Sequence, residues 1–558
     1  MKILNLLLML MLAPSLLFAQ LIELSEFPKR LQLYPRNSQD SGTVVISGLV
    51  LEAGHTSASV KVRRNSAPLV HVSVPLVYMG DSASFSFSVK IHSELSLYKF
   101  ELLVDSLVSA TADSVVSGDA YIMDGQSNSV GSGNWYYTSP WIRSFGDNYN
   151  WSANPDSALR ADTVWSIATT CLKNQIGSIA MSLAKNIIEK DSIPICIING
   201  GVSATVIESH LPSTNPTSIY QRLYYRVIHA DLKDNIIGAF WHQGESDTWS
   251  ASGYRIKFCQ IYDAWMGDYP GIQKVYVFQI RTITCGGAQQ QILREQQRII
   301  PEARPNISLM TGTLDLGSDG CHYNSEGYRT MGNWLYGLVA RDYYHSVDTV
   351  YITPPNIREA FFSNIGKTVL TLQFDQPVIP SDTGMCRYFS LDNVWDVADS
   401  IQSDSSTYCL TLYLKSPSNA TRISYIPNST YSTTGTLYNG PWLRNPRGIG
   451  ALTFYDFPIT SGATIVKQKK TIPESGLTAS PNPFNPYVLL TLPDRDVDIR
   501  GDFSLKIFNA AGRMVADLSR AVKEGSAIWH SQGQPSGIYV ARISSGSHHW
   551  RRTIVLIK

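Results

Sequence analysis

Between residues 119 and 346 the sequence alternates short apolar runs with segments of helical periodicity, and this alternation restricts the possible folds more than any other feature. Four of the five runs are nearly continuous in apolar residues, as strands buried on both faces are. In the intervening segment 174–190, apolar residues fall on one helical face. The pattern predicts an α/β domain with a mainly parallel sheet and helices on both faces. The five predicted strands are AYIMDG (120–125), IPICIING (193–200), IIGAFWHQ (236–243), KVYVFQI (274–280) and ISLMTG (307–312).

The segments on either side lack this alternation and are rich in β-branched and aromatic residues separated by turn residues. Residues 84–89, SFSFSV, alternate strictly, which is typical of a strand in a β-sandwich. Because 558 residues are too many for one core, we predict a multidomain chain. The predicted parts are a signal peptide (1–19), a β-sandwich (20–118), the α/β domain (119–346), a β-sandwich (347–457), a linker (458–476) and a C-terminal β-sandwich (477–558).

The first twenty residues, MKILNLLLMLMLAPSLLFAQ, have the composition of a secretory signal peptide. Lys2 precedes an apolar stretch, and the small residue Ala19 suits a cleavage site. A membrane anchor is the alternative, but the apolar run is short for a span and no polybasic flank follows it. We therefore expect a secreted or cell-surface protein with no membrane span after removal of the signal.

Charge and cysteine content bear on partners and on the redox environment. The formal net charge is +1 and charged residues make up 16% of the chain, so a nucleic-acid partner is not expected. Seven cysteines leave at least one thiol without an intrachain partner. Cys386 and Cys409, in one small β-rich region, are the first predicted disulfide, and Cys285 and Cys321, in two loops at one edge of the predicted sheet, are the second. No spacing fits a zinc site, so no metal is expected.

Polar residues follow four of the predicted strands. They are GQSN (125–128), NGG (199–201), HQGESD (242–247) and, after the fifth strand, DGCH (319–322). Because the carboxyl ends of parallel strands meet at one edge of a sheet, we expect these four loops to converge. Together they would supply a serine, a histidine and carboxylates, the groups that ester hydrolysis uses, since a serine hydroxyl attacks only when a base takes its proton.

Each of these residues has a simpler interpretation when it is taken alone. Ser127 could cap the next segment, and His322 could be a core histidine. Glu245 and Asp247 could be solvated loop charges, and Trp249 could be a packing residue. Their joint placement after four strands, rather than any single residue, favours a catalytic site.

These blocks carry a resemblance to a known family. GDAYIMDGQSN, the pair Gly200-Gly201 with Thr205 and Glu208, WHQGESD, and D-x-x-H followed by EGY resemble the sialate O-acetylesterase and acetylxylan esterase group of the SGNH (GDSL-like) hydrolases. The resemblance covers about residues 119–345. It implies a flavodoxin-like three-layer core and a serine esterase that removes acetyl groups from carbohydrates without a cofactor.

The resemblance also implies catalytic roles. Ser127 becomes the nucleophile, His322 becomes the base, and the N–H groups of Ser127 and Gly201 become oxyanion donors. Many members carry an asparagine amide where this chain reads Gln243-Gly244-Glu245, so the Gln243 side chain is the proposed third donor.

Two carboxylates compete for the role of orienting His322. Asp319 is favoured because it lies three residues before the histidine, whereas Glu245 is the acid implied by esterases that share the sequence His-Gln-Gly-Glu. Gln126, Asn128 and Trp249 are the predicted substrate-binding residues.

The last segment carries a second resemblance. The stretches ASPNPFNP, IFNAAGRMV and PSGIYVARISSG are similar to those of a type IX secretion C-terminal sorting domain, which implies a bacterial source and secretion machinery as a partner. An ordinary terminal β-sandwich is the alternative. For the whole chain, the alternative to an esterase is a non-catalytic surface protein that binds glycans or mediates adhesion on an SGNH scaffold.

Overall fold

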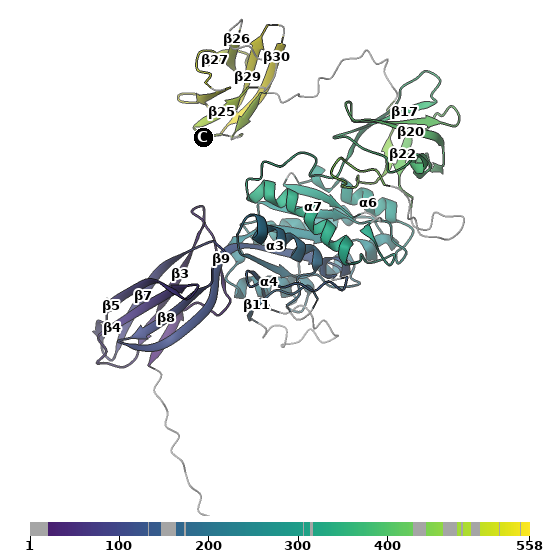
Figure 1. The fold of residues 1–558 in the computed structure, drawn as a ribbon. Helices are drawn as coiled ribbons and strands as arrows, with labels where there is room; N and C mark the ends of the chain where they lie inside the picture. Colours follow the sequence, from purple (N-terminus) through teal and green to yellow (C-terminus); the bar gives the residue numbers. More distant parts are fainter. Residues whose placement is uncertain are drawn as a thin grey trace, which may run out of the picture. The chain divides into compact units, whose positions relative to one another are not determined.

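The structure is a computed structural model in which the chain forms two compact units, residues 1–462 and 463–558 (Figure 1). The predicted signal peptide and residues 461–476 of the predicted linker lie outside the described residues. The described residues are 21–131, 133–146, 163–171, 174–304, 306–312, 316–427, 442–460, 477–480, 482, 484–492, 503–523, 525–546 and 548–557.

The centre of the first unit is a sheet whose strands follow the order β11-β10-β12-β9-β13-β14-β15. Five neighbouring pairs, from β10–β12 to β14–β15, are parallel, and only the edge pair β10–β11 is antiparallel among the pairs of this path. All five predicted apolar runs form strands of this sheet. These strands are β9 (Leu107–Gly125), β12 (Ile195–Asn199), β13 (Ile236–His242), β14 (Lys274–Gln279) and β15 (Ile307–Thr311). Two further strands, β10 (Ile142–Phe145) and β11 (Trp165–Ile167), extend the sheet beyond β12.

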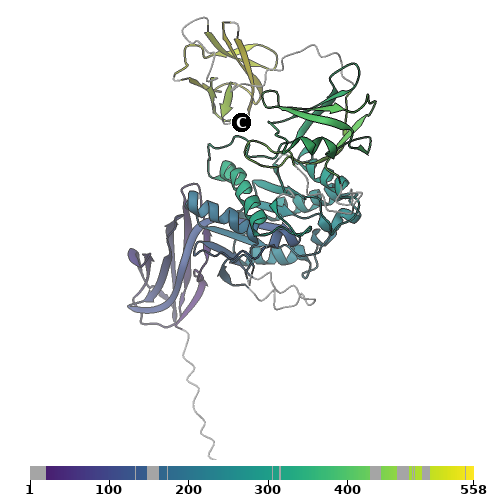
Figure 2. The ribbon, with the colours of Figure 1, turned by 45° about the vertical axis from the view of Figure 1, so that its right-hand side comes forward.

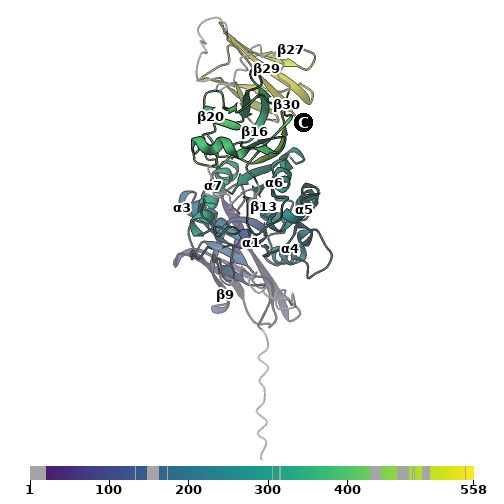
Figure 3. The same cartoon turned by 90° about the vertical axis from the view of Figure 1, so that its right-hand side faces the viewer.

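Helices cover both faces of this sheet (Figure 3). Helices α3 (Ser178–Lys190) and α7 (Ser325–Tyr343) lie on one face, where Tyr121 and Met123 of β9 join their core. Ala120 and Ile122 point to the other core because side chains alternate along a strand. That second face is covered by α4 (Ile219–His229), α5 (Tyr254–Asp268) and α6 (Gln290–Arg298).

Strand β9 crosses the predicted domain boundary at residues 118 and 119, so the boundary is wrong as a break in the structure (Figure 2). Its first half pairs with β8 (Tyr98–Val104) of the N-terminal region, and its second half pairs with β12 and β13. Val115 belongs to the N-terminal core, while the next residue, Val116, belongs to the central core. One continuous strand therefore joins the two regions without a linker.

The other regions are built mainly from antiparallel pairs of strands, and the short strand β2 (Leu33–Pro35), which runs parallel to β9, is an exception. The N-terminal strands β1 (Ile22–Glu26), β3 (Ser41–Val50), β6 (Tyr78–Met79) and β7 (Ser82–His92) face β4 (Ser57–Arg64), β5 (Ala67–Pro75) and β8 across one core. A second core is shared by the sheets β16-β17-β21-β20 and β19-β18-β22-β23. Their strands are β16 (Ile357–Phe362), β17 (Val369–Phe374), β18 (Phe389–Leu391), β19 (Val394–Trp395), β20 (Ala398–Asp404), β21 (Cys409–Leu414), β22 (Arg422–Tyr425) and β23 (Phe454–Pro458). In the second unit, the sheets β24-β25-β28 and β27-β26-β29-β30 share a third core. Their strands are β24 (Thr478–Ser480), β25 (Tyr487–Thr491), β26 (Phe503–Asn509), β27 (Met514–Asp517), β28 (Ser526–His530), β29 (Gly537–Ser545) and β30 (His548–Leu556).

One of the two predicted disulfides is present. Cys285 and Cys321 are bonded, as the second prediction states. The first prediction is wrong, because Cys386 and Cys409 are both free. Cys386 is buried in the short 3-10 helix Thr383–Tyr388, whereas the Cys409 thiol contacts Gln373 of the neighbouring strand. No helix in the described part of the chain is long and apolar enough to cross a membrane.

Candidate active site

The candidate nucleophile lies directly after the central strand β9. Gly125 ends the strand with φ of 138°, and a Cβ built on it would lie 2.0 Å from the backbone oxygen of His242. Only glycine fits so close to the neighbouring strand. The N–H of Gln126 donates to the same oxygen at 3.0 Å, and Ser127 then begins the short helix α1 (Ser127–Val130).

The structure brings Ser127 and His322 together, although 195 positions separate them in sequence. The serine Oγ lies 3.0 Å from His322 Nε2, within hydrogen-bond distance. Asp319 Oδ2 lies 3.5 Å from the other ring nitrogen, Nδ1, which is ion-pair distance but longer than a hydrogen bond. The order hydroxyl, imidazole, carboxylate is the one that an activated serine requires.

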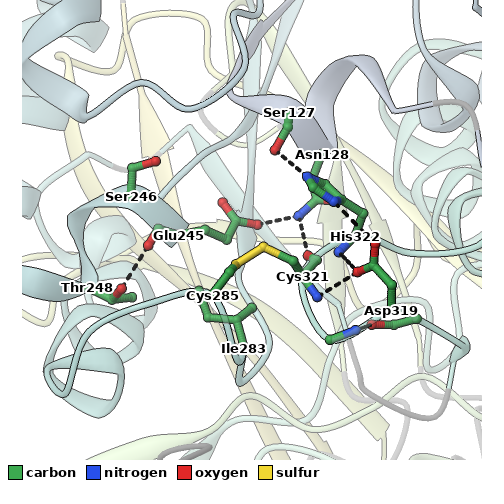
Figure 4. Close-up of a disulfide and its surroundings, with 12 residues drawn as sticks. Ser127, Asn128, Glu245, Ser246, Thr248, Ile283, Cys285, Asp319, Cys321 and His322 are labelled. Atoms are coloured by element: carbon green, nitrogen blue, oxygen red, sulfur yellow. Dashed lines mark hydrogen bonds and ion pairs between the residues drawn. A yellow bond between two sulfur atoms is a disulfide. The ribbon is translucent and has the colours of Figure 1, made fainter.

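Asp319 also organises the backbone of the histidine loop. Its Oδ1 accepts hydrogen bonds from the N–H groups of Cys321 at 2.8 Å and of His322 at 2.6 Å (Figure 4). Burial by itself would raise the pKa of Asp319, but these two N–H groups and the nearby His322 lower it overall. The side chain is therefore a carboxylate at neutral pH, able to stabilise an imidazolium.

Glu245 occupies a different place and is not the neighbour of His322. It begins the 3-10 helix η3 (Glu245–Trp249) after β13, and its buried Oε1 accepts from Asn128 Nδ2 at 2.6 Å. The same oxygen lies 3.6 Å from His242 Nδ1. Burial lowers the pKa of His242 and keeps that ring neutral. Of the two carboxylates considered for orienting His322, the favoured Asp319 lies beside the ring, whereas the alternative, Glu245, contacts Asn128 and His242.

Gln126 and Asn128 are both buried, and the substrate-binding role of their side chains stays a prediction. Gln126 Oε1 accepts from the N–H groups of Gly244 and Ser246, at 3.2 and 3.1 Å. Asn128 Nδ2 donates to Glu245 and to the backbone oxygen of Cys321, and its Oδ1 accepts from the Tyr328 hydroxyl. The hydrogen bonds of these two amides to neighbouring segments fix the positions of the residues on both sides of Ser127.

Two of the three predicted oxyanion donors are already engaged. The N–H of Gly201 donates to Asn199 Oδ1 at 2.8 Å. The Gln243 amide nitrogen has only two hydrogens, and Asp247 Oδ2, the Thr205 oxygen and Gln126 Oε1 all accept from it. Neither predicted donor role fits this geometry. Ser127 differs, because the first N–H groups of a helix have no partner within it.

Trp249 is the one tryptophan of the described residues whose side chain is largely exposed, at 70%. It ends η3, and the preceding residue is fixed on both sides: Thr248 Oγ1 donates to Glu245 O and accepts from the N–H of Gly287. A Cβ on Gly287 would lie 2.7 Å from the Trp249 ring, so this loop packs directly against it. An exposed aromatic ring on a rigid element suits contact with a ligand.

A buried polar network that sequence reasoning missed lies behind the serine. Asp124 Oδ1 accepts from the N–H of Gly125 at 2.7 Å and lies 3.1 Å from His210 Nδ1, while His210 Nε2 lies 2.8 Å from Thr205 Oγ1. Asp247 accepts from the N–H of Ile207, and burial raises the pKa of this carboxyl to about 6. No sequence signal separates His210 from a surface histidine, because its partners come from other segments.

A serine, an imidazole and a carboxylate in this order, at the carboxyl edge of a parallel sheet, are typical of serine esterases. Residues 117–341 match a family described as "Carbohydrate esterase, sialic acid-specific acetylesterase". The protein is a carboxylic ester hydrolase, a carbohydrate acetylesterase, and the match covers its central α/β region. No curated protein sequence matches the chain.

Several solved structures are similar to this one. A carbohydrate acetylesterase from Xanthomonas citri is 18% identical with a TM-score of 0.55, and the likeness covers 78% of this chain and 99% of that one. A protein from Arabidopsis thaliana is also 18% identical, with a TM-score of 0.33 and coverage of 40% and 99%. A family two carbohydrate esterase from Cellvibrio japonicus is 12% identical, with a TM-score of 0.26 and coverage of 58% and 95%. The first of these shows a shared fold.

Proposed function

We propose that the protein removes O-acetyl groups from an acetylated polysaccharide or from sialic acid, with Ser127 as nucleophile, His322 as general base and Asp319 as the orienting acid. The observation that carries the proposal is the 3.0 Å contact between Ser127 Oγ and His322 Nε2, with the Asp319 carboxylate beside Nδ1. A serine without such a base is too weak a nucleophile to attack an ester.

The reaction follows from this geometry in two halves. Ser127 Oγ attacks the acetyl carbonyl while its proton moves to His322 Nε2. The negative charge of Asp319, beside the ring, stabilises the positive charge that forms on the imidazole. His322 then gives this proton to the sugar oxygen as the carbon–oxygen bond breaks, which leaves an acetyl group on Ser127. Water attacks the acetyl-enzyme while His322 takes its proton. His322 then returns this proton to Ser127 Oγ as the bond between the acetyl carbon and the serine oxygen breaks, and acetate leaves.

The N–H of Ser127 is the donor that we propose for the oxyanion. One such donor contributes about 3 kcal/mol to the transition state of acyl transfer. Because the amides of Gly201 and Gln243 are engaged elsewhere, the remaining donors would come from the substrate's own hydroxyl groups or from water.

Trp249 is the residue that we propose for contact with the sugar. The apolar face of a sugar ring can stack on an indole, and this indole is both exposed and held by the loop around Gly287.

We propose in addition that the helices on the two faces of the central sheet make the flavodoxin-like, three-layer core of SGNH hydrolases. Export through the predicted signal peptide, to the medium or to the cell surface, is part of the same proposal. The second unit would then act as a type IX sorting domain that the bacterial secretion machinery recognises. Its two sheets around one core are compatible with that role.

The decisive experiment measures acetate release from acetylated xylan, acetylated pectin and O-acetyl sialic acid by the full chain and by Ser127→Ala. We expect release from at least one substrate by the wild type, and a loss of at least about a thousandfold in the variant with unchanged circular dichroism. Full activity in Ser127→Ala would refute the assignment. Glycan binding by both proteins, without acetate release by either, would favour the adhesion alternative.

A further inference from the structure

The loop that carries His322 is exposed, which raises the question of what fixes the imidazole. The side chains of His322 and Asp319 are 45% and 66% exposed. Burial and packing therefore contribute little to their positions, and long loops without such packing are mobile. A displacement of about 1 Å between reacting groups can cost about a hundredfold in rate.

Three links tie this loop to the rest of the site, and Figure 4 shows two of them, the disulfide and the Asn128 bond. The disulfide joins Cys321, the residue before the histidine, to Cys285 in the loop after β14. The backbone oxygen of Gly320 accepts from the N–H of Thr284 at 2.9 Å. Asn128, next to the nucleophile, donates to the oxygen of Cys321 at 3.2 Å. The covalent link and the Thr284 bond both lead to the same loop.

The loop that contains Cys285 is itself held firmly. The N–H of Gly287 donates to Thr248 Oγ1 at 2.8 Å, and Gln290 Nε2 donates to the oxygen of Ile283 at 2.9 Å. Gln290 Oε1 in turn accepts from the N–H of Ile283 at 2.9 Å. The sulfur bridge therefore connects an exposed catalytic loop to a segment fixed by buried side chains.

We propose that the Cys285–Cys321 disulfide is a positioning element for His322, so that turnover depends on its oxidised state. This inference rests on the proposed function, because it assigns a role to the bond only if His322 is the base. A dithiol that reduces the bond gives up two electrons and two protons, forms its own disulfide and leaves thiols at 285 and 321. The Thr284 and Asn128 hydrogen bonds then hold the loop alone, and the ring spends less time facing Ser127.

The test compares the full chain with the double variant Cys285→Ser and Cys321→Ser. A small aryl acetate is the substrate, since it makes few contacts beyond the acetyl group. We expect kcat to fall at least about tenfold with KM changed by less than about twofold, because the base is misplaced while the substrate site remains. The matched control is Cys259→Ser, which makes the same change at a free thiol of α5 and should leave kcat as in the wild type.

Reduction of the wild type supplies a second measurement that does not depend on folding of the variant. Dithiothreitol should lower kcat to the level of the double variant, with the near-ultraviolet circular dichroism retained, and reoxidation should restore it. The double variant should respond to neither treatment. A folded double variant, or a reduced wild type, with kcat within about twofold of the untreated enzyme would overturn the inference while leaving the proposed function standing. A wild type that releases no acetate would instead refute the proposed function.

Discussion

Replacing Asn128 with alanine tests whether this residue stabilises the folded site or, as its sequence position predicts, binds the substrate. The variant loses three hydrogen bonds: to the Glu245 carboxylate at 2.6 Å, to the Cys321 oxygen at 3.2 Å, and from the Tyr328 hydroxyl at 2.8 Å. All of them lie in the interior beside Ser127. The Glu245 carboxylate and the Tyr328 hydroxyl are left without a replacement from water, because both residues are buried, whereas the Cys321 oxygen is only partly buried.

The magnitude follows from the kinds of bond that are lost. A hydrogen bond to a charged group contributes about 1.5–3 kcal/mol, and a neutral one about 0.5–1.5 kcal/mol. One bond of the first kind and two of the second sum to roughly 4 kcal/mol. Because a domain is stable by only about 5–15 kcal/mol, such a loss would be visible as a large shift of the unfolding midpoint.

The assay is urea unfolding of the wild type, Asn128→Ala, Glu245→Ala and the double variant. We expect the two single changes to be non-additive, with a coupling free energy of about 2 kcal/mol for the Asn128–Glu245 bond. Glu245→Gln is the matched control, since its oxygen can still accept from Asn128 while its charge is removed, and it should destabilise less than Glu245→Ala. We also expect kcat to fall in Asn128→Ala, because the Cys321 anchor of the histidine loop is lost.

A different result would show that the reasoning is wrong. A ligand-binding asparagine would raise KM and leave the unfolding curve in place. A loss below about 1 kcal/mol together with additive single changes would mean that the buried contacts do not stabilise the site.

Three further predictions address the acid, the substrate contact and a buried carboxyl. Asp319→Asn should lower kcat by about 10²–10⁴-fold, whereas Glu245→Gln should keep most of the activity, as steady-state kinetics would show. Trp249→Ala should raise KM for an acetylated polysaccharide several-fold without changing turnover of a small aryl acetate, and Tyr413→Ala, which removes an exposed aromatic of β21 (Cys409–Leu414), should change neither. Asp247 has a folded-state pKa of about 6, above the ordinary 3.8, so its contribution to stability is present below about pH 4 and is lost as the pH rises through 6. Melting temperatures from pH 4 to 8 should show this decline in the wild type and not in Asp247→Asn.

The strands of the central sheet are predictable because each is marked by a local run of apolar residues. The continuation of β9 past residue 118 is not predictable, because it depends on partners that are distant in the sequence. Continuous apolar runs mark buried strands wherever they occur. Ser117-Gly118-Asp119 reads as a turn, yet these residues continue β9. Asp119 is accepted inside the sheet because Arg36 pairs with both of its oxygens, at 2.8 and 3.0 Å, and the Tyr344 hydroxyl donates to it. Partners 83 and 225 positions away cannot be seen in the local pattern.

The candidate site is likewise predictable from the sequence only in part. The placement of Ser127 and His322 follows from the rule that loops after parallel strands share an edge, and the Cys285–Cys321 pair follows from the same rule. The rule says nothing about side-chain direction. Sequence position therefore does not reveal that Gln126, Asn128 and Gln243, for which substrate or oxyanion roles are predicted, are buried. Two cysteines in loops at the same edge of a sheet are expected to be close, whereas two cysteines in the same β-rich region need not be. The wrong prediction of a Cys386–Cys409 disulfide rests on the second, weaker argument.

The GQSN and HQGESD motifs are hydrogen-bonded to each other, so their presence in a sequence indicates the fold before it indicates the activity. Gln126 accepts from two backbone N–H groups of the second motif, and Asn128 donates to Glu245 within it. A buried N–H group without an acceptor costs free energy, so the amide at 126 is required by the fold whatever the substrate is. A chain could keep nearly every polar residue of both motifs and still lack activity if its serine or its histidine were displaced. The contact between Ser127 and His322, rather than the motifs around it, is therefore the feature that separates an esterase from a binding protein on the same scaffold.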